Sequence, residues 1–305
     1  MATQEEQSAF DELEEIISRM ENDTKQEARE DYYETLKSAI SVLPNVDSIR
    51  FECPNPFRHR ILRKCWEEYD FQVITCPVAQ GTHVFNVLHA AKETGLAIRH
   101  FIYERLLALY FSQSFSLQLV ADGLASDLDS LSLNILVFVN TFVTEAESQA
   151  FQALLMQSPR LRKLDISFEG FAVVPVTVFP SHHFPSLESL SIIANTTEEN
   201  SGQLLDFITM HSSSLRELQI VSMKLESDNT FRGVMERLRN ELGGTLERFQ
   251  ICGSIMEGER EMMIFPHYNK DWTPYRRRRT STAKKLEDFL LREGPWPDMP
   301  PSIPT

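Results

Sequence analysis

His182 and His183 stand side by side and are the residues whose types could most directly hold a metal or carry protons. Imidazole groups serve as zinc ligands and as general bases near neutral pH. Consecutive side chains on an extended chain point to opposite sides, however, and no acidic residue lies within four positions to orient either ring. The spacing therefore favours a solvated loop ahead of Phe184 over a metal or catalytic site.

The cysteines offer little more for chemistry. Cys53, Cys65 and Cys76 follow one another at intervals of twelve and eleven residues, and Cys252 lies far along the chain. Zinc sites usually contain at least one close cysteine pair, so we expect reduced, mostly buried thiols. The G-x-S-x-G, G-x-x-x-x-G-K-[ST], G-x-G-x-x-G and H-E-x-x-H motifs are also absent. We expect no enzyme activity, no metal and no cofactor.

A short basic segment is the most conspicuous local feature. It predicts an exposed basic patch with adjacent hydroxyl groups, formed by Arg276, Arg277, Arg278, Arg279, Thr280 and Ser281. Three interpretations stay open: a solvated loop, a nuclear-import or acidic-partner docking site, and a target of kinases that prefer arginine ahead of the hydroxyl.

Charge is distributed unevenly along the 305 residues. The formal net charge is −14, yet residues 270–285 carry seven basic side chains against one acid, whereas residues 1–34 carry twelve acids and three bases. An acidic chain with one basic run lacks the broad positive face that binds phosphate backbones, which argues against nucleic acid as the main partner. An acidic start is also the opposite of a secretory signal, so we expect a cytoplasmic or nuclear location, or both.

Composition indicates a globular chain of one large domain or two ordinary ones. The 42% share of apolar residues can build a substantial core, and 10% aromatic residues argue against wholesale disorder. The longest nearly apolar run, residues 171–180, contains two prolines and is far shorter than the roughly 20 residues that cross a bilayer. A membrane is therefore not expected as a partner.

An apolar spacing recurs along the chain and predicts how its elements are arranged. Leu161-Arg-Lys-Leu164-Asp-Ile166 has the pattern L-x-x-L-x-I, which returns from Leu187, Leu215 and Leu246, and more loosely from Val46, Ile98, Leu128 and Leu286. The last two apolar residues of each unit are two apart, so on a strand they face the same side. Segments with helical periodicity lie between the units, at 146–157, 201–208 and 231–242. Each unit therefore reads as a strand followed by a helix.

One such unit cannot bury its apolar face alone, so the units are expected to stack. The prediction is an α/β fold: an irregular leucine-rich-repeat-like solenoid, or arc, with a mostly parallel sheet of seven or eight strands on the concave face and helices on the convex face. It is irregular because only Asn195 provides the polar residue that a regular repeat places eight positions after its first leucine. The alternative is an ordinary doubly wound α/β domain, whose strands would be more continuously apolar.

The repeat also predicts a binding face. Positions between the two inward residues of each strand point outward on the concave side. They are Arg50, Ile102, Ser132, Asp165, Ser191, Gln219, Gln250 and Leu290.

The pattern resembles the leucine-rich-repeat portion of fungal F-box-type proteins. The resemblance rests on residues 43–51, on the Phe184-Pro-Ser-Leu187 repeat entry, and on residues 285–294 with Pro295 and Pro297 after them. It covers roughly residues 24–297 and implies a substrate receptor or adaptor of a cullin-RING ubiquitin ligase, with a Skp-type adaptor as a partner. The residues before Thr24 contain no Leu-Pro start of an F-box.

These observations give one expected organisation. Residues 1–23 form an acidic amphipathic helix, residues 24–297 form the solenoid with a charged insertion at 253–283, and residues 298–305 are a proline-rich tail. The expected function is a protein–protein interaction module. The alternative is an unrecognised enzyme on an α/β scaffold, because a site can be hidden in a single sequence.

Overall fold

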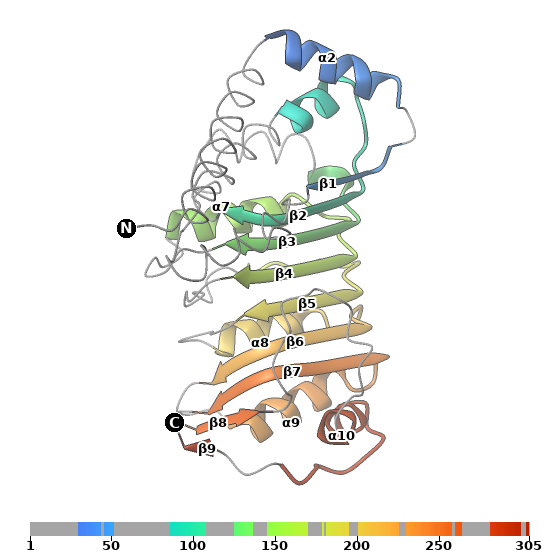
Figure 1. Cartoon of the computed structure of the whole chain (residues 1–305). Coiled ribbons are helices and arrows are strands. Elements are labelled where there is room, and N and C mark those ends of the chain that lie inside the picture. The colour runs from blue at the N-terminus through green and yellow to red at the C-terminus, as the bar shows by residue number, and fades with distance from the viewer. Residues whose placement is uncertain are drawn as a thin grey trace, which may run out of the picture.

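The strands of the protein form one sheet in which strand order follows chain order (Figure 1). The computed structural model describes residues 30–43, 46–51, 86–107, 125–136, 145–169, 179, 181–194, 201–225, 230–257, 260–263, 281–299 and 303–304. The strands are β1 (Ser48–Phe51), β2 (His100–Leu107), β3 (Ser130–Leu136), β4 (Lys163–Glu169), β5 (Ser189–Ala194), β6 (Glu217–Leu225), β7 (Arg248–Glu257), β8 (Arg260–Met263) and β9 (Ile303–Pro304).

The helices are α2 (Glu30–Ser41), η2 (Ala125–Asp127, a 3-10 turn), α7 (Glu145–Met156), α8 (Ser201–Met210), α9 (Phe231–Leu242) and α10 (Ser281–Leu290). Residues 86–93 are also helical. Helices α7, α8 and α9 lie along one side of the sheet, while α2 lies at the β1 end (Figure 1).

Strands β1 to β7 pair in parallel, and β7 to β8 and β8 to β9 pair antiparallel. Leu164, Leu190 and Leu218 lie in register on neighbouring parallel strands, as the repeat requires. The predicted α/β class and mostly parallel sheet are thus confirmed.

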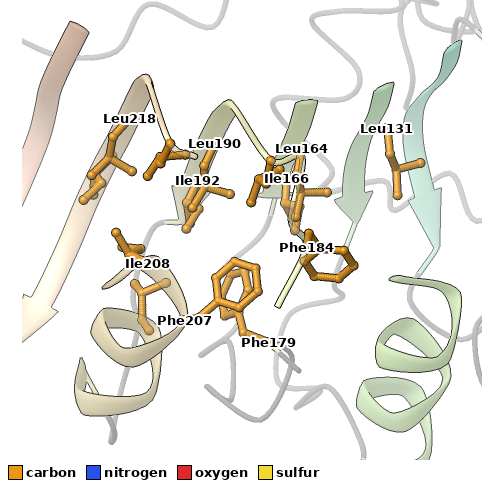
Figure 2. Packing of buried hydrophobic residues seen from close by; sticks show 14 of the residues in the cluster. Leu131, Leu164, Ile166, Phe179, Phe184, Leu190, Ile192, Phe207, Ile208 and Leu218 are labelled. Atoms are coloured by element: carbon orange, nitrogen blue, oxygen red, sulfur yellow. The ribbon is translucent and has the colours of Figure 1, made fainter. Parts of the chain in front are cut away.

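The repeated apolar residues form the layer between sheet and helices. Leu164 and Ile166 are completely buried, and their equivalents on β3, β5, β6 and β7 are at most 2% exposed. Figure 2 shows Leu131, Leu164, Leu190 and Leu218 side by side, with aromatic and aliphatic residues of the helix layer opposite them. At about 1.5–3 kcal/mol for each fully buried side chain, this layer is the main source of stability.

Each of the strands β2 to β7 begins with the same backbone contact to the preceding repeat. The carbonyl of Asp129 accepts the N–H groups of Arg162 and Lys163 at 2.8 and 3.0 Å, and the carbonyl of Arg162 accepts those of Glu188 and Ser189 in the same way. The contact recurs from Asp47 through to Arg248. Neighbouring repeats are therefore aligned at their strand entries by paired hydrogen bonds.

Helix α9 shows how the sequence fixes the ends of a helix. Its N-cap is Thr230, whose side chain accepts a hydrogen bond from the Gly233 N–H at 3.1 Å. Gly243 follows the last helical residue with an ordinary φ of −63°. A side chain is excluded there because a Cβ would lie 2.5 Å from the Arg239 carbonyl oxygen and 2.7 Å from that of Leu290.

The last predicted repeat strand, beginning at Leu286, is wrong. Residues 281–290 form helix α10, in which Leu286, Phe289 and Leu290 are at most 4% exposed. Leu290 therefore faces the core and does not belong to the predicted binding face. The spacing of Leu286, Phe289 and Leu290 is also that of a buried helix stripe, and the edge-on contacts of Trp296 with Phe289 and Phe231 give that stripe a partner.

Strand structure continues into the expected insertion at 253–283. β7 runs through Gly253 to Glu257, and β8 folds back against it. In the expected proline-rich tail, Ile303 and Pro304 pair with β8. The expected N-terminal helix at 1–23, residues 276–280, Asn195 and three of the cysteines lie outside the described residues.

A paired backbone irregularity explains why β7 can continue. Ser222 on β6 has φ +58° and Gly253 on β7 has φ +86°, and the register shifts between Val221 and Met223. Both strands resume pairing beyond this point. A Cβ on Gly253 would overlap the Ser222 hydroxyl and lie 3.0 Å from its backbone nitrogen, so glycine is required here.

We expect Gly253→Ala to lower the free energy of unfolding by roughly 2 to 5 kcal/mol, because left-handed strain and overlap with Ser222 add. Gly244→Ala is the matched control, since nothing lies within 4 Å of its Cβ position. That change should stay within about 0.5 kcal/mol of wild type. Urea unfolding of both variants measures the difference, and equal stabilities would contradict the assigned strain.

Candidate binding face

The predicted binding residues lie in one row across the sheet, on the side opposite the helices. Hydrogen-bonded register places them at equivalent positions of seven consecutive strands. From β1 to β7 this middle row is Arg50, Ile102, Ser132, Asp165, Ser191, Gln219 and Gln250.

The face becomes more buried along the strands, which the sequence did not predict. The row two residues earlier, here called the entry row, is Ser48, His100, Ser130, Lys163, Ser189, Glu217 and Arg248. Its members are exposed or half-buried, and the middle row is half-buried except for the exposed Arg50. Two residues further on, Asn134, Ser167 and Val221 are at most 5% exposed. The accessible part of the face is thus its strand-entry side.

Polar side chains on this face bond to one another across strands. In the middle row, the Ser132 hydroxyl donates to Asp165 Oδ2 at 3.3 Å and the Ser191 hydroxyl lies 3.4 Å from Gln219 Oε1. In the entry row, Glu217 accepts from the Arg248 guanidinium at 3.0 Å. The surface is polar, carries both signs of charge and is held in a defined arrangement.

Asp165 is the most desolvated ionisable group in the middle row. Burial raises the pKa of its carboxyl group, while the hydroxyls of Ser191 and Ser132 and the charge on Lys163 act in the opposite direction. The Ser191 hydroxyl has a single hydrogen, so Asp165 and Gln219 compete for it. The charged form of Asp165 is therefore disfavoured in the folded protein relative to the protonated form.

The two adjacent histidines meet a third one that the sequence did not single out. The His183 ring stacks on His211 with ring centroids 5.3 Å apart, and His182 packs edge-on against Phe184. Fully buried His211 accepts the Phe184 N–H through Nε2 at 3.0 Å, and its Nδ1 lies 2.7 Å from the Phe207 carbonyl oxygen. Both ring nitrogens are thus used by the backbone, so His211 is a neutral structural link between α8 and the β5 entry.

Burial is the largest cause that lowers the pKa of His211, to about 4. The neighbouring His183 and His182 lower it further, whereas the hydrogen bond to Phe207 opposes the shift. Within the described residues, no group of three or more His, Cys, Asp or Glu side chains is placed to hold a metal ion.

Of the predicted basic patch, Ser281 begins α10, and Arg276, Arg277, Arg278, Arg279 and Thr280 fall outside the described residues. None of the described helices has the length and apolar character to cross a bilayer.

Together, fold and face define an α/β protein whose in-order, mostly parallel sheet is covered by helices on one side and polar on the other. No family model matches the chain, and neither do any of the curated proteins or solved structures.

Acid should destabilise the protein through His211. The folded pKa of about 4 lies below the ordinary 6.5, so the unfolded chain binds more protons between these values. Stability from this group is complete above about pH 6.5 and is lost as the pH falls toward 4; from pH 7 to pH 5 the loss is about 2 kcal/mol. Urea unfolding at both pH values should show this extra loss in wild type and in His183→Gln, but not in His211→Gln. Equal losses in wild type and His211→Gln would refute the link.

Asp165 should show the opposite dependence. Its folded pKa is raised, so the folded chain binds the extra proton and stability from this group decreases as the pH rises through that window. Asp165→Asn, which still accepts from Ser132, should therefore raise the melting temperature at pH 7 and lose this advantage in acid. Asp206→Asn is the control: it removes an exposed carboxylate that pairs with Arg237 at 2.6 Å, and should slightly destabilise. A lower melting temperature for Asp165→Asn at pH 7 would contradict the assignment.

Proposed function

We propose that this chain is a protein-interaction module, built as an irregular leucine-rich-repeat-like solenoid, that binds another protein through the sheet face opposite the helices. The observation that carries the proposal is the polar face itself, which continues in register across seven strands. In-order stacking of strand and helix units supports the solenoid description over a doubly wound domain, in which strand order departs from chain order.

The two sides of the sheet divide the tasks of folding and recognition. Leu164 and Ile166 are buried toward the helices, whereas Lys163 and Asp165 point to the other side of the same strand. Outward residues can therefore differ between relatives without disturbing the core, which suits recognition. Six strand spacings at about 4.8 Å give a face about 29 Å long, enough for an extended segment or a helix of a partner.

The entry row indicates where a partner would make contact. Lys163 and Arg248 are exposed, and Glu217 lies between them in the row beside Ser189. Charges of both signs suit a polar protein surface. The net charge of −14 and the mixed signs do not suit a nucleic-acid backbone.

A ubiquitin-ligase role is a further part of the proposal and rests on the resemblance to fungal F-box-type proteins alone. In that role the sheet face would hold a substrate, and a Skp-type adaptor with its cullin would accompany the chain. An unrecognised enzyme is the competing class.

Charge reversal on the entry row tests the binding face. Lys163→Glu with Arg248→Glu changes two exposed residues and removes one ion pair, that of Arg248 with Glu217. The matched control is Arg232→Glu with Lys285→Glu, which also changes two exposed basic residues and removes one ion pair, that of Arg232 with Glu236. We expect partners captured from native cells by wild type and control to be lost by the entry-row variant, with all three chains folded at the assay temperature.

Binding of each purified partner should weaken roughly tenfold or more in the entry-row variant, as for reversal of a contact charge. An unchanged partner list would reject the face as the binding surface. Recovery of partners without any Skp-type adaptor or cullin would keep the interaction module and reject the ligase role. A turnover activity that survives the charge reversal would instead favour the enzyme.

A further inference from the structure

A column of charged residues runs along the sheet at the strand entries, beside the entry row. Each member occupies the second position of its repeat, between the first apolar residue and the strand. We call these residues the charge column: Asp47, Arg99, Asp129, Arg162, Glu188, Arg216 and Glu247.

The signs in the charge column alternate without exception. Every neighbouring pair joins opposite charges, and every residue has the same sign as the residue two places away. Charged residues make up 24% of the chain, so composition alone does not fill seven equivalent positions with charges. Alternation is therefore a property of the repeat array.

The backbone holds these residues next to one another. Each carbonyl in the column up to Arg216 accepts two N–H groups from the next strand entry, at 2.8 to 3.0 Å. Arg162 donates to both carboxylate oxygens of Glu188 at 2.8 Å, and Arg216 lies 4.0 Å from Glu247. Glu188 raises the pKa of Arg162, and Asp129 on the other side also raises it. Arg162 thus interacts electrostatically with both of its neighbours in the column, and Arg216 with Glu247.

These pairs are too exposed to contribute much to stability. The side chains of Arg162 and Glu188 are 59% and 47% exposed, and water screens pairs of this kind, so their separate contributions to stability are small. Their sign pattern, however, distinguishes correct from incorrect strand order. If one repeat were skipped, the two column residues brought together at the new junction would carry like charges, so two attractive contacts would be replaced by one repulsive contact.

The repeats need such discrimination because their apolar residues are nearly interchangeable. Leu164-Asp-Ile166 and Leu190-Ser-Ile192 present the same inward pair, so burial alone does not decide which strands pair. The connections are also long, with 26 residues from Leu161 to Leu187, and long loops cost little more to close than short ones. We propose that the alternating charge column specifies the order of the strands during folding by opposing arrangements that skip a repeat.

The test separates the charge pattern from the number of substitutions. Arg162→Glu with Arg216→Glu creates four like-charge neighbours with two changes. A second variant carries four changes, Arg162→Glu, Glu188→Arg, Arg216→Glu and Glu247→Arg. It creates only one pair of like-charged neighbours, between Asp129 and position 162. Each pair of like-charged neighbours should shift the equilibrium between native and skipped pairing by a factor of about two. The variant with two substitutions, called the twofold variant, should therefore refold from urea with a low native yield at low salt. The variant with four substitutions, called the fourfold variant, should refold nearly like wild type.

Salt and a control on another surface complete the experiment. At about 1 M NaCl the screening length falls to about 3 Å, so the yield of the twofold variant should recover. Arg232→Glu with Lys284→Glu places like charges along α9 and α10, where each basic residue pairs with an acid four residues on, and should leave the refolding yield unchanged. The proposal is overturned if the twofold variant refolds as fully as wild type, if 1 M NaCl does not restore it, or if the fourfold variant refolds worse than the twofold one.

Discussion

Burial of one face of each strand is the constraint on which the rest of the structure depends. Leu190 and Ile192 are buried only because β4 and β6 flank their strand and α8 lies over them. A single unit would leave both residues in water, so every repeat gains its stability from its neighbours. The paired hydrogen bonds at the strand entries have the same origin, since they can form only between adjacent repeats in register. Order along the chain thus becomes order in space.

Much of the fold could be predicted because this constraint leaves a periodic trace. The L-x-x-L-x-I spacing predicted parallel neighbours for Leu164, Leu190 and Leu218, and they are in register. The spacing was misleading at Leu286. With a leucine at position 290, the apolar residues from Leu286 onward fit the buried stripe of a helix as well as they fit a repeat strand. The bulge at Ser222 and Gly253 left no periodic signal, because it depends on backbone angles in two strands at once.

The position of the candidate face was predictable from the sequence, but the burial of its residues toward the ends of the strands was not. Alternation along each strand is enough to place Ser132, Asp165 and Gln219 in one row, since side chains on a strand alternate sides. The burial of Asn134 and Ser167 two positions further on depends on the tertiary arrangement and leaves no mark in the local pattern. The charge column, by contrast, could have been read directly from the second position of each repeat.

Strand entries therefore combine two requirements in adjacent residues. Arg162 lies in the charge column and pairs with the next repeat, while Lys163 lies beside it in the entry row and is exposed on the sheet face. Because the two positions are separate, the sequence of the face can change while the column keeps its alternation. The column is restricted by its neighbours on both sides, since one reversed sign creates two like-charge contacts. Variation between related chains should accordingly be freer at the position of Lys163 than at that of Arg162.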